Sequence, residues 1–138
     1  MDSIGTPFAG GGLNTGLRDL ARFGEMLRNG GRFNGQQIVP EAVIADIRAG
    51  ADKQAFAKAG YTLLKDWSYR SMWWVTDKEG GAFMARGVHG QRIYVDPKAE
   101  MVIVRYASHP VTGNSANDPV TLPAFDALAE YLNRNKQQ

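Results

Sequence analysis

Apolar residues recur at helical spacing in three stretches of the chain. The first stretch predicts a helix with one apolar face, formed by Leu17, Leu20, Ala21, Phe23, Gly24 and Leu27. Asn14 or Thr15 is expected to cap this helix, because its side-chain oxygen can accept from the free N–H groups of the first turn. Two glycines at residues 30–31 are expected to end it. A second helix is predicted over residues 40–50, beginning at a proline, and a third over residues 121–132.

Between the second and third helices the pattern changes to that of β-strands. Four strands are predicted, over residues 69–76, 83–88, 91–95 and 101–107. The connections between them are too short for crossovers, so the strands are expected to pair as antiparallel neighbours in a meander. The continuous apolar run at residues 101–104 predicts a strand that is buried on both faces. The last helix is expected to cover one face of this sheet, because both apolar surfaces need a partner.

Two shorter segments complete the predicted architecture. Asn34-Gly35 predicts a tight turn between short extended pieces at residues 32–33 and 36–39. Residues 51–65 give a mixed pattern, which we interpret as a short helix followed by a loop. The prediction is therefore an α+β fold, with an antiparallel sheet of about four strands, helices that precede it, and a C-terminal helix packed on one face. No repeat or interdomain linker interrupts residues 1–138, so we expect a single domain.

Composition excludes several classes of protein. The hydrophobic fraction of 43% and the charged fraction of 22% are typical of a globular domain. A net charge of +2, with basic residues scattered except at residues 134–136, predicts no nucleic-acid partner. The absence of cysteine excludes a thiolate nucleophile. No stretch approaches the length of a membrane span and residues 1–5 lack the pattern of a signal peptide, so we expect no membrane partner and a cytoplasmic location.

The common catalytic and metal-binding motifs are missing. No Gly-x-Ser-x-Gly elbow occurs, and no serine is followed three residues later by a lysine that could activate it. Ser115-x-Asn117 and Tyr131-x-Asn133 match loose Ser/Tyr-x-Asn patterns, for which we favour a structural interpretation. The two histidines are twenty residues apart without further ligands, and Gly11–Gly16 is followed by the wrong residues for a phosphate loop. We therefore expect neither a metal nor a cofactor.

One segment, residues 85–97, carries an unusual combination of residues. Gly87 and Gly90 flank His89 at the point where one predicted strand turns into the next. Glycine within a strand pattern often marks the close approach of a ligand or of another backbone. From the residues alone, however, a tight hairpin with His89 at an exposed tip is the favoured interpretation.

Two segments resemble serine hydrolases related to the class C β-lactamases. The first is Gly11-Gly12-Leu13-Asn14-Thr15 followed by residues 18–27, and the second is residues 87–91 with residues 94–97 and 102–104. The closest resemblance is to the branch that contains 6-aminohexanoate-dimer hydrolase and related carboxylesterases. It runs in the expected order from about residue 11 to residue 110 and includes a C-terminal helix. The resemblance implies a partial β-lactamase-like fold.

The resemblance also implies a role for the turn at residues 87–91. In the family, a serine in a Ser-x-x-Lys motif attacks an ester or amide carbonyl, and a strand with a Lys-Thr-Gly-like box contributes a backbone N–H to the oxyanion hole. Residues 88–91 look like the counterpart of that box, although Lys-Thr-Gly itself is absent. The backbone N–H of Val88 or that of Gln91 would be the oxyanion donor. His89 and Gly90 would line the cleft and contact substrate.

Three hypotheses follow for the function. In the first, the chain is the C-terminal part of such a hydrolase, inactive alone because the Ser-x-x-Lys nucleophile is absent, and the surface left uncovered leads to self-association. The substrate of the full enzyme would be a small ester or amide, and lactams, esters and linear amides all stay open. In the second, the chain is a non-catalytic binding or structural module. In the third, it is a small enzyme with a site around His89, Tyr94 and Ser71, which we rank last because no nucleophile–base spacing supports it.

Overall fold

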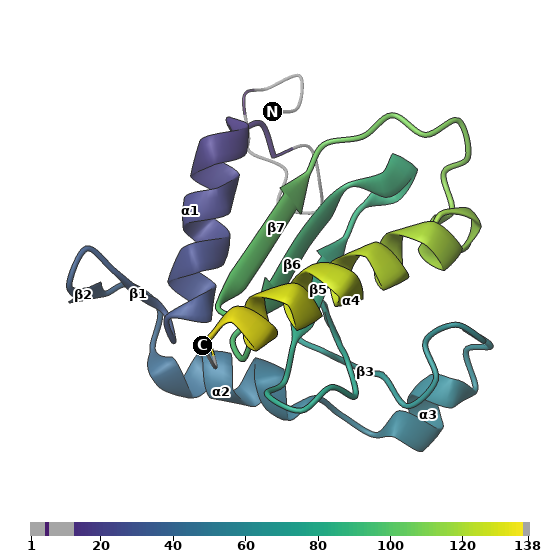
Figure 1. Ribbon diagram of the computed structural model, residues 1–138, viewed down its shortest axis with the longest axis horizontal. Coiled ribbons are helices and arrows are strands. Elements are labelled where there is room, and N and C mark those ends of the chain that lie inside the picture. Colours follow the sequence, from purple (N-terminus) through teal and green to yellow (C-terminus); the bar gives the residue numbers. More distant parts are fainter. Residues whose placement is uncertain (1–4, 6–12, 137–138) are drawn as a thin grey trace.

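The computed structural model describes residue 5 and residues 13–136 (Figure 1). Its centre is a five-stranded antiparallel sheet in which the strands are neighbours in chain order. The strands are β3 (Ser68–Arg70), β4 (Trp73–Val75), β5 (Phe83–Arg86), β6 (Arg92–Asp96) and β7 (Met101–Arg105). A separate hairpin pairs β1 (Arg32–Phe33) with β2 (Gln36–Gln37). The predicted meander is therefore confirmed, with one strand more than expected.

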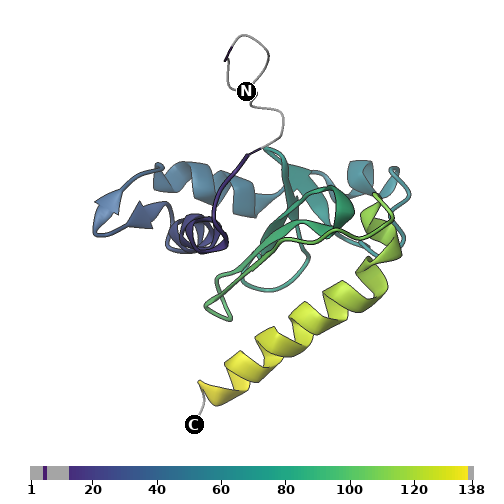
Figure 2. The same cartoon turned by 90° about the horizontal axis from the view of Figure 1, so that it is seen from above.

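Helices cover both faces of the sheet, so the molecule has three layers (Figure 2). The helices are α1 (Leu17–Arg28), α2 (Glu41–Ala49), the short α3 (Lys53–Ala57) and α4 (Asp118–Asn135). Helices α1 and α2 lie on one face of the sheet and α4 lies on the other (Figures 1 and 2). The predicted C-terminal helix on one face is confirmed, and the helices that precede the sheet cover the opposite face.

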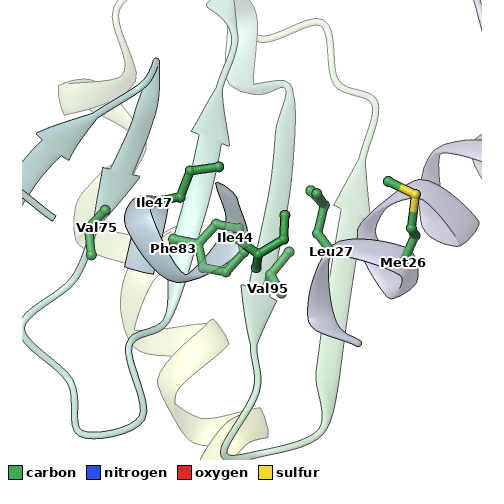
Figure 3. Packing of buried hydrophobic residues seen from close by; sticks show 7 residues of the cluster. All are labelled: Met26, Leu27, Ile44, Ile47, Val75, Phe83 and Val95. Atoms are coloured by element: carbon green, nitrogen blue, oxygen red, sulfur yellow. The ribbon is translucent and has the colours of Figure 1, made fainter. Parts of the chain in front are cut away.

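Each helix layer closes its own apolar core. On the α1–α2 side the core contains Met26, Leu27, Ile44, Ile47, Val75, Phe83 and Val95 (Figure 3). On the α4 side it contains Ala82, Met84, Tyr94, Ala99, Met101, Phe125 and Ala129. Alternate residues of β5 and β6 enter opposite cores, as the two-residue period of a strand requires. The sheet is thus held from both sides along its central strands.

The additional strand arises within the segment that was predicted as one strand at residues 69–76. This segment folds back on itself as the β3–β4 hairpin, with Ser71 and Met72 at the turn. Both residues have positive φ, 48° and 66°, which is the conformation of a type I′ hairpin turn. Such turns usually contain asparagine or glycine, so the sequence gives no warning of this one.

Three further expectations need correction. Helix α1 begins after Gly16, which has no side-chain cap, so neither Asn14 nor Thr15 supplies the expected one. Strand β7 is an edge strand whose residues 102–105 are half-buried, and it is therefore not buried on both faces as residues 101–104 predicted. Helix α4 begins earlier than expected, at Asp118.

Helix α1 approaches the sheet closely at one residue. Gly24 packs against β6 and β7, and a Cβ placed on it would lie 2.5 Å from Cγ1 of Val102 and 3.4 Å from Cγ2 of Ile93. Glycine at this position therefore sets how near the helix can lie to the strands.

In the described part of the chain, no helix is long and apolar enough to cross a membrane. The cytoplasmic location and the single domain stay predictions.

Candidate oxyanion turn and adjoining cleft

Residues 87–91 form the turn that joins β5 to β6, and we call this segment the β5–β6 turn. It contains a short 3-10 helix, Val88–Gly90, in which His89 and Gly90 have positive φ, 55° and 92°. The N–H of Gly87 donates to the carbonyl oxygen of Gln91 at 3.0 Å, which closes the hairpin. The N–H of Gln91 donates to the carbonyl oxygen of Val88 at 3.2 Å. The backbone of this turn is therefore tightly wound.

His89 fastens the turn to the loop that follows β7. Its backbone N–H donates to the carbonyl oxygen of Thr112 at 3.2 Å, and its own carbonyl accepts from the N–H of His109 at 3.1 Å. The ring Nδ1 lies 2.8 Å from the carbonyl oxygen of His109, and since a carbonyl only accepts, Nδ1 carries the proton. His89 is half-buried, whereas the side chain of Val88 is 59% exposed. The expectation of an exposed histidine at the tip is wrong, because Val88 takes that place.

The side chain of Gln91 makes a second bridge to the same loop. Its Nε2 donates to the carbonyl oxygen of Ala107 at 2.5 Å, and its Oε1 accepts from the N–H of Ala107 at 3.3 Å. The amide thus pairs with one residue of the loop as a neighbouring strand would. Gly90 lies against the same loop, because a Cβ built on it would overlap the ring of His109. The two glycines and Gln91 together fix the conformation of the β5–β6 turn.

A cleft of about 670 Å³ adjoins the turn. It lies between the segment that enters α1, the β3–β4 hairpin and the strands β5 to β7. Its lining includes Leu13, Met72, Gly87, Gln91 and Tyr106. Of the predicted site residues, Gln91 therefore lines the cleft, whereas Val88, His89 and Gly90 do not line it in the described part of the chain.

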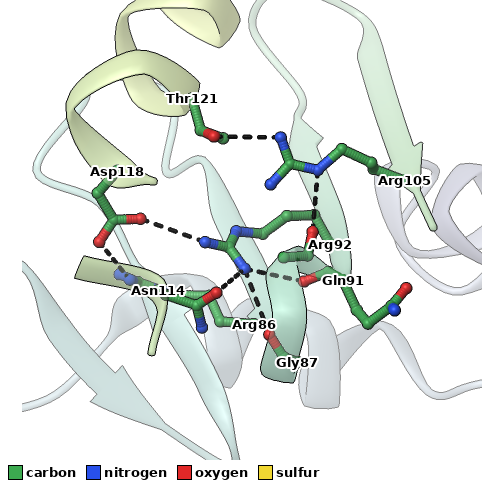
Figure 4. A network of polar contacts seen from close by, with 9 residues as sticks. Arg86, Gly87, Gln91, Arg92, Arg105, Asn114, Asp118 and Thr121 are labelled. Carbon is green, nitrogen blue, oxygen red and sulfur yellow. Dashed lines mark hydrogen bonds and ion pairs between the residues drawn. The ribbon is translucent and has the colours of Figure 1, made fainter. Parts of the chain in front are cut away.

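Sequence reasoning missed a group of buried charges behind the β5–β6 turn. Arg86 and Arg92 both form ion pairs with Asp118, at 2.5 and 3.2 Å, and the side chains of all three are at most 3% exposed (Figure 4). Arg105 reaches the turn itself, since its Nε donates to the carbonyl oxygen of Gly90 at 2.9 Å. Arg92 also donates to the carbonyl oxygens of Gly87 and Gln91. No local pattern marks these residues, because arginine is usually solvent-exposed and their partners lie far along the chain.

Burial and charge determine the protonation of two residues in this part of the molecule. Burial, together with the neighbouring charge of Arg86, lowers the pKa of Arg92 to about 10. Burial and the charge of Asp96 raise the pKa of Tyr94, so its hydroxyl stays protonated. Tyr94 packs against the ring of Phe125 in α4. It is therefore poorly suited to act as the base of the small-enzyme hypothesis. In the described residues its side-chain hydrogen bonds and ring contacts are with Lys78, Asp96 and Phe125, and not with His89 or Ser71.

The first resembling segment lies only in part within the described residues. Gly11 and Gly12, which open the first resembling segment, lie outside the described residues, while Leu13 and residues beyond it are described. Within the described part of the chain, no three histidine, aspartate or glutamate side chains come together in a way that could hold a metal ion.

Comparison with known proteins finds two relatives of which the chain matches a part. No protein-family model matches it. A 6-aminohexanoate-dimer hydrolase of Paenarthrobacter ureafaciens is 36% identical over 111 residues, which make up 80% of this chain and 28% of that protein. A solved structure named "Putative 6-aminohexanoate-dimer hydrolase from Bacillus anthracis" matches with a TM-score of 0.69 and 34% identity, over 86% of this chain and 29% of that one. The chain is homologous to a part of the 6-aminohexanoate-dimer hydrolases.

This relationship confirms the resemblance predicted from the residues and supports the C-terminal part of a β-lactamase-related hydrolase as its source. The chain spans less than a third of the length of both relatives. The likeness in both sequence and fold shows that most of this chain is similar to one part of that solved structure. The carboxylesterase relationship stays a prediction.

Proposed function

We propose that this chain supplies the oxyanion side of a serine hydrolase active site that cleaves small esters or amides. Catalysis requires a nucleophile from another polypeptide segment, because no serine of the chain is followed three residues later by lysine. The observation that carries the proposal is the β5–β6 turn, whose backbone is held rigid beside the cleft in a chain homologous to hydrolases. Lactam, ester and linear amide substrates remain alternatives within it.

The geometry favours Val88 over Gln91 as the oxyanion donor. The N–H of Gln91 is directed at the carbonyl oxygen of Val88 and is already hydrogen-bonded there. Among the described residues the N–H of Val88 has no hydrogen-bond acceptor, and the adjoining Gly87 lines the cleft although the side chain of Val88 does not. A backbone N–H held rigidly in such a turn suits the charge of a tetrahedral intermediate, because it needs no reorganisation when the charge develops.

His89 and Gly90 then have positioning roles in the proposal, in place of direct contact with substrate. His89 uses its N–H, its carbonyl and its ring Nδ1 to hold the loop at residues 109–112. Gly90 leaves the space that the ring of His109 occupies. Both residues fix the direction in which the N–H of Val88 points.

We propose that another surface covers the cleft in the active protein, because exposed apolar side chains lie beside it. Leu13 and Met72 line the cleft and are 80% and 79% exposed. Tyr106, also in the lining, is 49% exposed although its hydroxyl donates to the carbonyl oxygen of Thr15. Clustered apolar side chains at a surface usually mark an interaction site. We propose that the isolated chain self-associates here, which analytical ultracentrifugation over a range of concentrations would detect as a rise in mass; sedimentation as a monomer throughout would contradict it.

A chimera tests the proposed function directly. In the Paenarthrobacter ureafaciens hydrolase, the 111 aligned residues are replaced by those of this chain. We expect the chimera to hydrolyse the 6-aminohexanoate dimer and to be labelled by a fluorophosphonate. Val88→Pro removes the backbone N–H and should lower kcat by roughly 10²–10³-fold, as the loss of one oxyanion donor does.

The matched control for this experiment is Val88→Ala, which shortens the side chain and keeps the N–H. It should retain most of the activity of the unsubstituted chimera. Equal losses in the two variants would show that the side chain matters and the N–H does not. A folded chimera without activity would refute the proposal that this chain supplies half of the site.

A further inference from the structure

The arginine cluster behind the β5–β6 turn holds more positive than negative charge. It consists of Arg86, Arg92 and Arg105, and Asp118 is the only carboxylate that forms an ion pair with any of them in the described residues. Three guanidinium groups against one carboxylate leave two positive charges without a partner of opposite sign. Buried charges are normally paired, because an isolated ion loses its hydration without compensation.

Several N–H groups of this cluster also lack acceptors. Within the described part of the chain, no hydrogen-bond partner is found for Nε and Nη1 of Arg86, Nε of Arg92 or Nη2 of Arg105, although all four atoms are buried. The side-chain amide nitrogen of Asn117, next to Asp118, is unpaired as well. Native proteins leave few buried donors unsatisfied, so unpaired donors gathered in one place need an explanation.

Among the described residues, Asp118 is the one carboxylate paired with these arginines. The remaining acceptors are neutral: Asn114 Oδ1 at 2.5 Å from Arg92, Thr121 Oγ1 at 3.1 Å from Arg105, and backbone carbonyls of the turn (Figure 4). Helix α4 begins at Asp118 and directs the positive end of its dipole to the same place. Aromatic rings cover two of the arginines. The guanidinium carbon of Arg86 lies 4.5 Å from the ring centroid of Trp74, and that of Arg105 lies 6.0 Å from the ring centroid of Phe125.

We infer that the arginine cluster is a binding site for a carboxylate. A guanidinium presents its N–H groups as a planar fork, which matches the two oxygens of a carboxylate. One carboxylate would accept from the unpaired N–H groups of the cluster and neutralise one of the two excess charges. All three arginines also line the cleft beside the turn, which gives such a group a route of approach. The carboxylate belongs either to a small molecule or to an aspartate or glutamate of a further polypeptide segment.

The protonation of Arg92 is consistent with this inference. Its pKa is lowered to about 10, first by burial and then by the charge of Arg86, which means that the charged form is poorly compensated as the cluster stands. The counter-charge of Asp118 acts in the opposite direction but does not cancel these effects. An added carboxylate would raise this pKa again. The inference does not depend on the hydrolase function, because it concerns a charge balance that any role of the chain must satisfy.

Titration of the 138-residue chain with sodium acetate tests the site, with sodium chloride at matched ionic strength as the reference. Acetate should raise the midpoint of thermal unfolding in a saturable way, by about 5 °C once its concentration is roughly ten times Kd. In ¹H–¹⁵N spectra the Nε–H signals of Arg86 and Arg92 should shift along the same saturation curve. Equal responses to acetate and chloride would overturn the inference, because general screening by salt would then be sufficient.

Variants separate the cluster from the overall charge of the protein. Arg105→Met removes one guanidinium that has no carboxylate partner in the described residues, and it should abolish the saturable response to acetate. Arg22→Met is the matched control, because it removes the same charge from an exposed ion pair with Asp19. If Arg105→Met does not fold, Arg105→Lys keeps the charge but loses the fork and should weaken acetate binding tenfold or more. An undiminished acetate response in a folded Arg105 variant would overturn the inference.

The same signals distinguish the two sources of the carboxylate. In the chimera described above, the Nε–H signals would lie at the shifted position without acetate if a side chain of the added segment occupies the site. They would still titrate with acetate if the site takes a small molecule. Both results support a carboxylate site, whereas signals that remain unshifted and insensitive to acetate in both proteins would refute it.

Discussion

Gly90 lies so close to the loop after β7 that it has no room for a side chain. The β5–β6 turn and this loop therefore pack directly against each other at Gly90. Its φ of 92° is costly for any residue with a Cβ, and a Cβ there would overlap the ring of His109. His89 then ties the same loop through three hydrogen bonds. At the scale of single residues, His89 and Gly90 therefore hold the β5–β6 turn against this loop.

Gly90→Ala should lower the free energy of unfolding by about 2 kcal/mol or more, because backbone strain and overlap with His109 add together. Gly60→Ala is the control, since Gly60 has a similar φ of 77° but nothing within 4 Å of an added Cβ. It should cost about 1 kcal/mol from strain alone. Urea denaturation measures both, and His109→Ala should reduce the cost of Gly90→Ala toward that of Gly60→Ala. Equal costs at Gly60 and Gly90 would show that the His109 contact is unimportant.

The sequence indicated this turn but not its details. Two glycines around a histidine could be recognised as a place of close backbone approach, and the structure shows such an approach between Gly90 and His109. The partners of His89 and Gln91 lie about twenty residues further along the chain, and no local pattern reports such a contact. The arginine cluster escaped notice for a related reason, because its charges come from β5, β6, β7 and α4.

At the scale of elements, the apolar periods predicted the helices and most strands, since burial on one face leaves a regular trace. The β3–β4 hairpin was missed because Ser71 and Met72 take positive φ without glycine or asparagine. The position of α1 on the sheet depends on a single glycine. The helical period of residues 17–27 predicts that Gly24 lies on the buried face. It does not predict how closely α1 approaches Val102, because that distance depends on how the helix packs on the sheet.

Gly24→Ala tests how closely α1 packs on β7. Alanine favours helix by up to about 1 kcal/mol over glycine, but the added Cβ would lie 2.5 Å from the stiff side chain of Val102. We expect a net loss of about 1–2 kcal/mol in unfolding free energy. In a Val102→Ala background the overlap is gone, so the same substitution should become stabilising by roughly 0.5–1 kcal/mol. Chemical denaturation of the four proteins gives this cycle, and the absence of a sign change would refute the close packing.

At the scale of the whole molecule, helices stabilise both faces of the sheet. The β5–β6 turn lies at one end of the sheet, and the cleft adjoins this turn. The chain matches less than a third of each relative, although the match covers most of its own length in sequence and structure. A rigid turn beside an apolar, uncovered cleft is what one side of a shared active site requires. We predict that the nucleophile comes from another polypeptide segment, because no serine of the chain is followed three residues later by a lysine.

The central claim is that this chain carries the oxyanion side of a hydrolase site and no nucleophile of its own. Treatment of the purified chain with a fluorophosphonate, read by intact mass, tests it most directly. We predict no adduct, because none of the five serines has a lysine three residues later to activate it. A stoichiometric adduct on one serine would contradict the account and would identify a complete active site within these 138 residues.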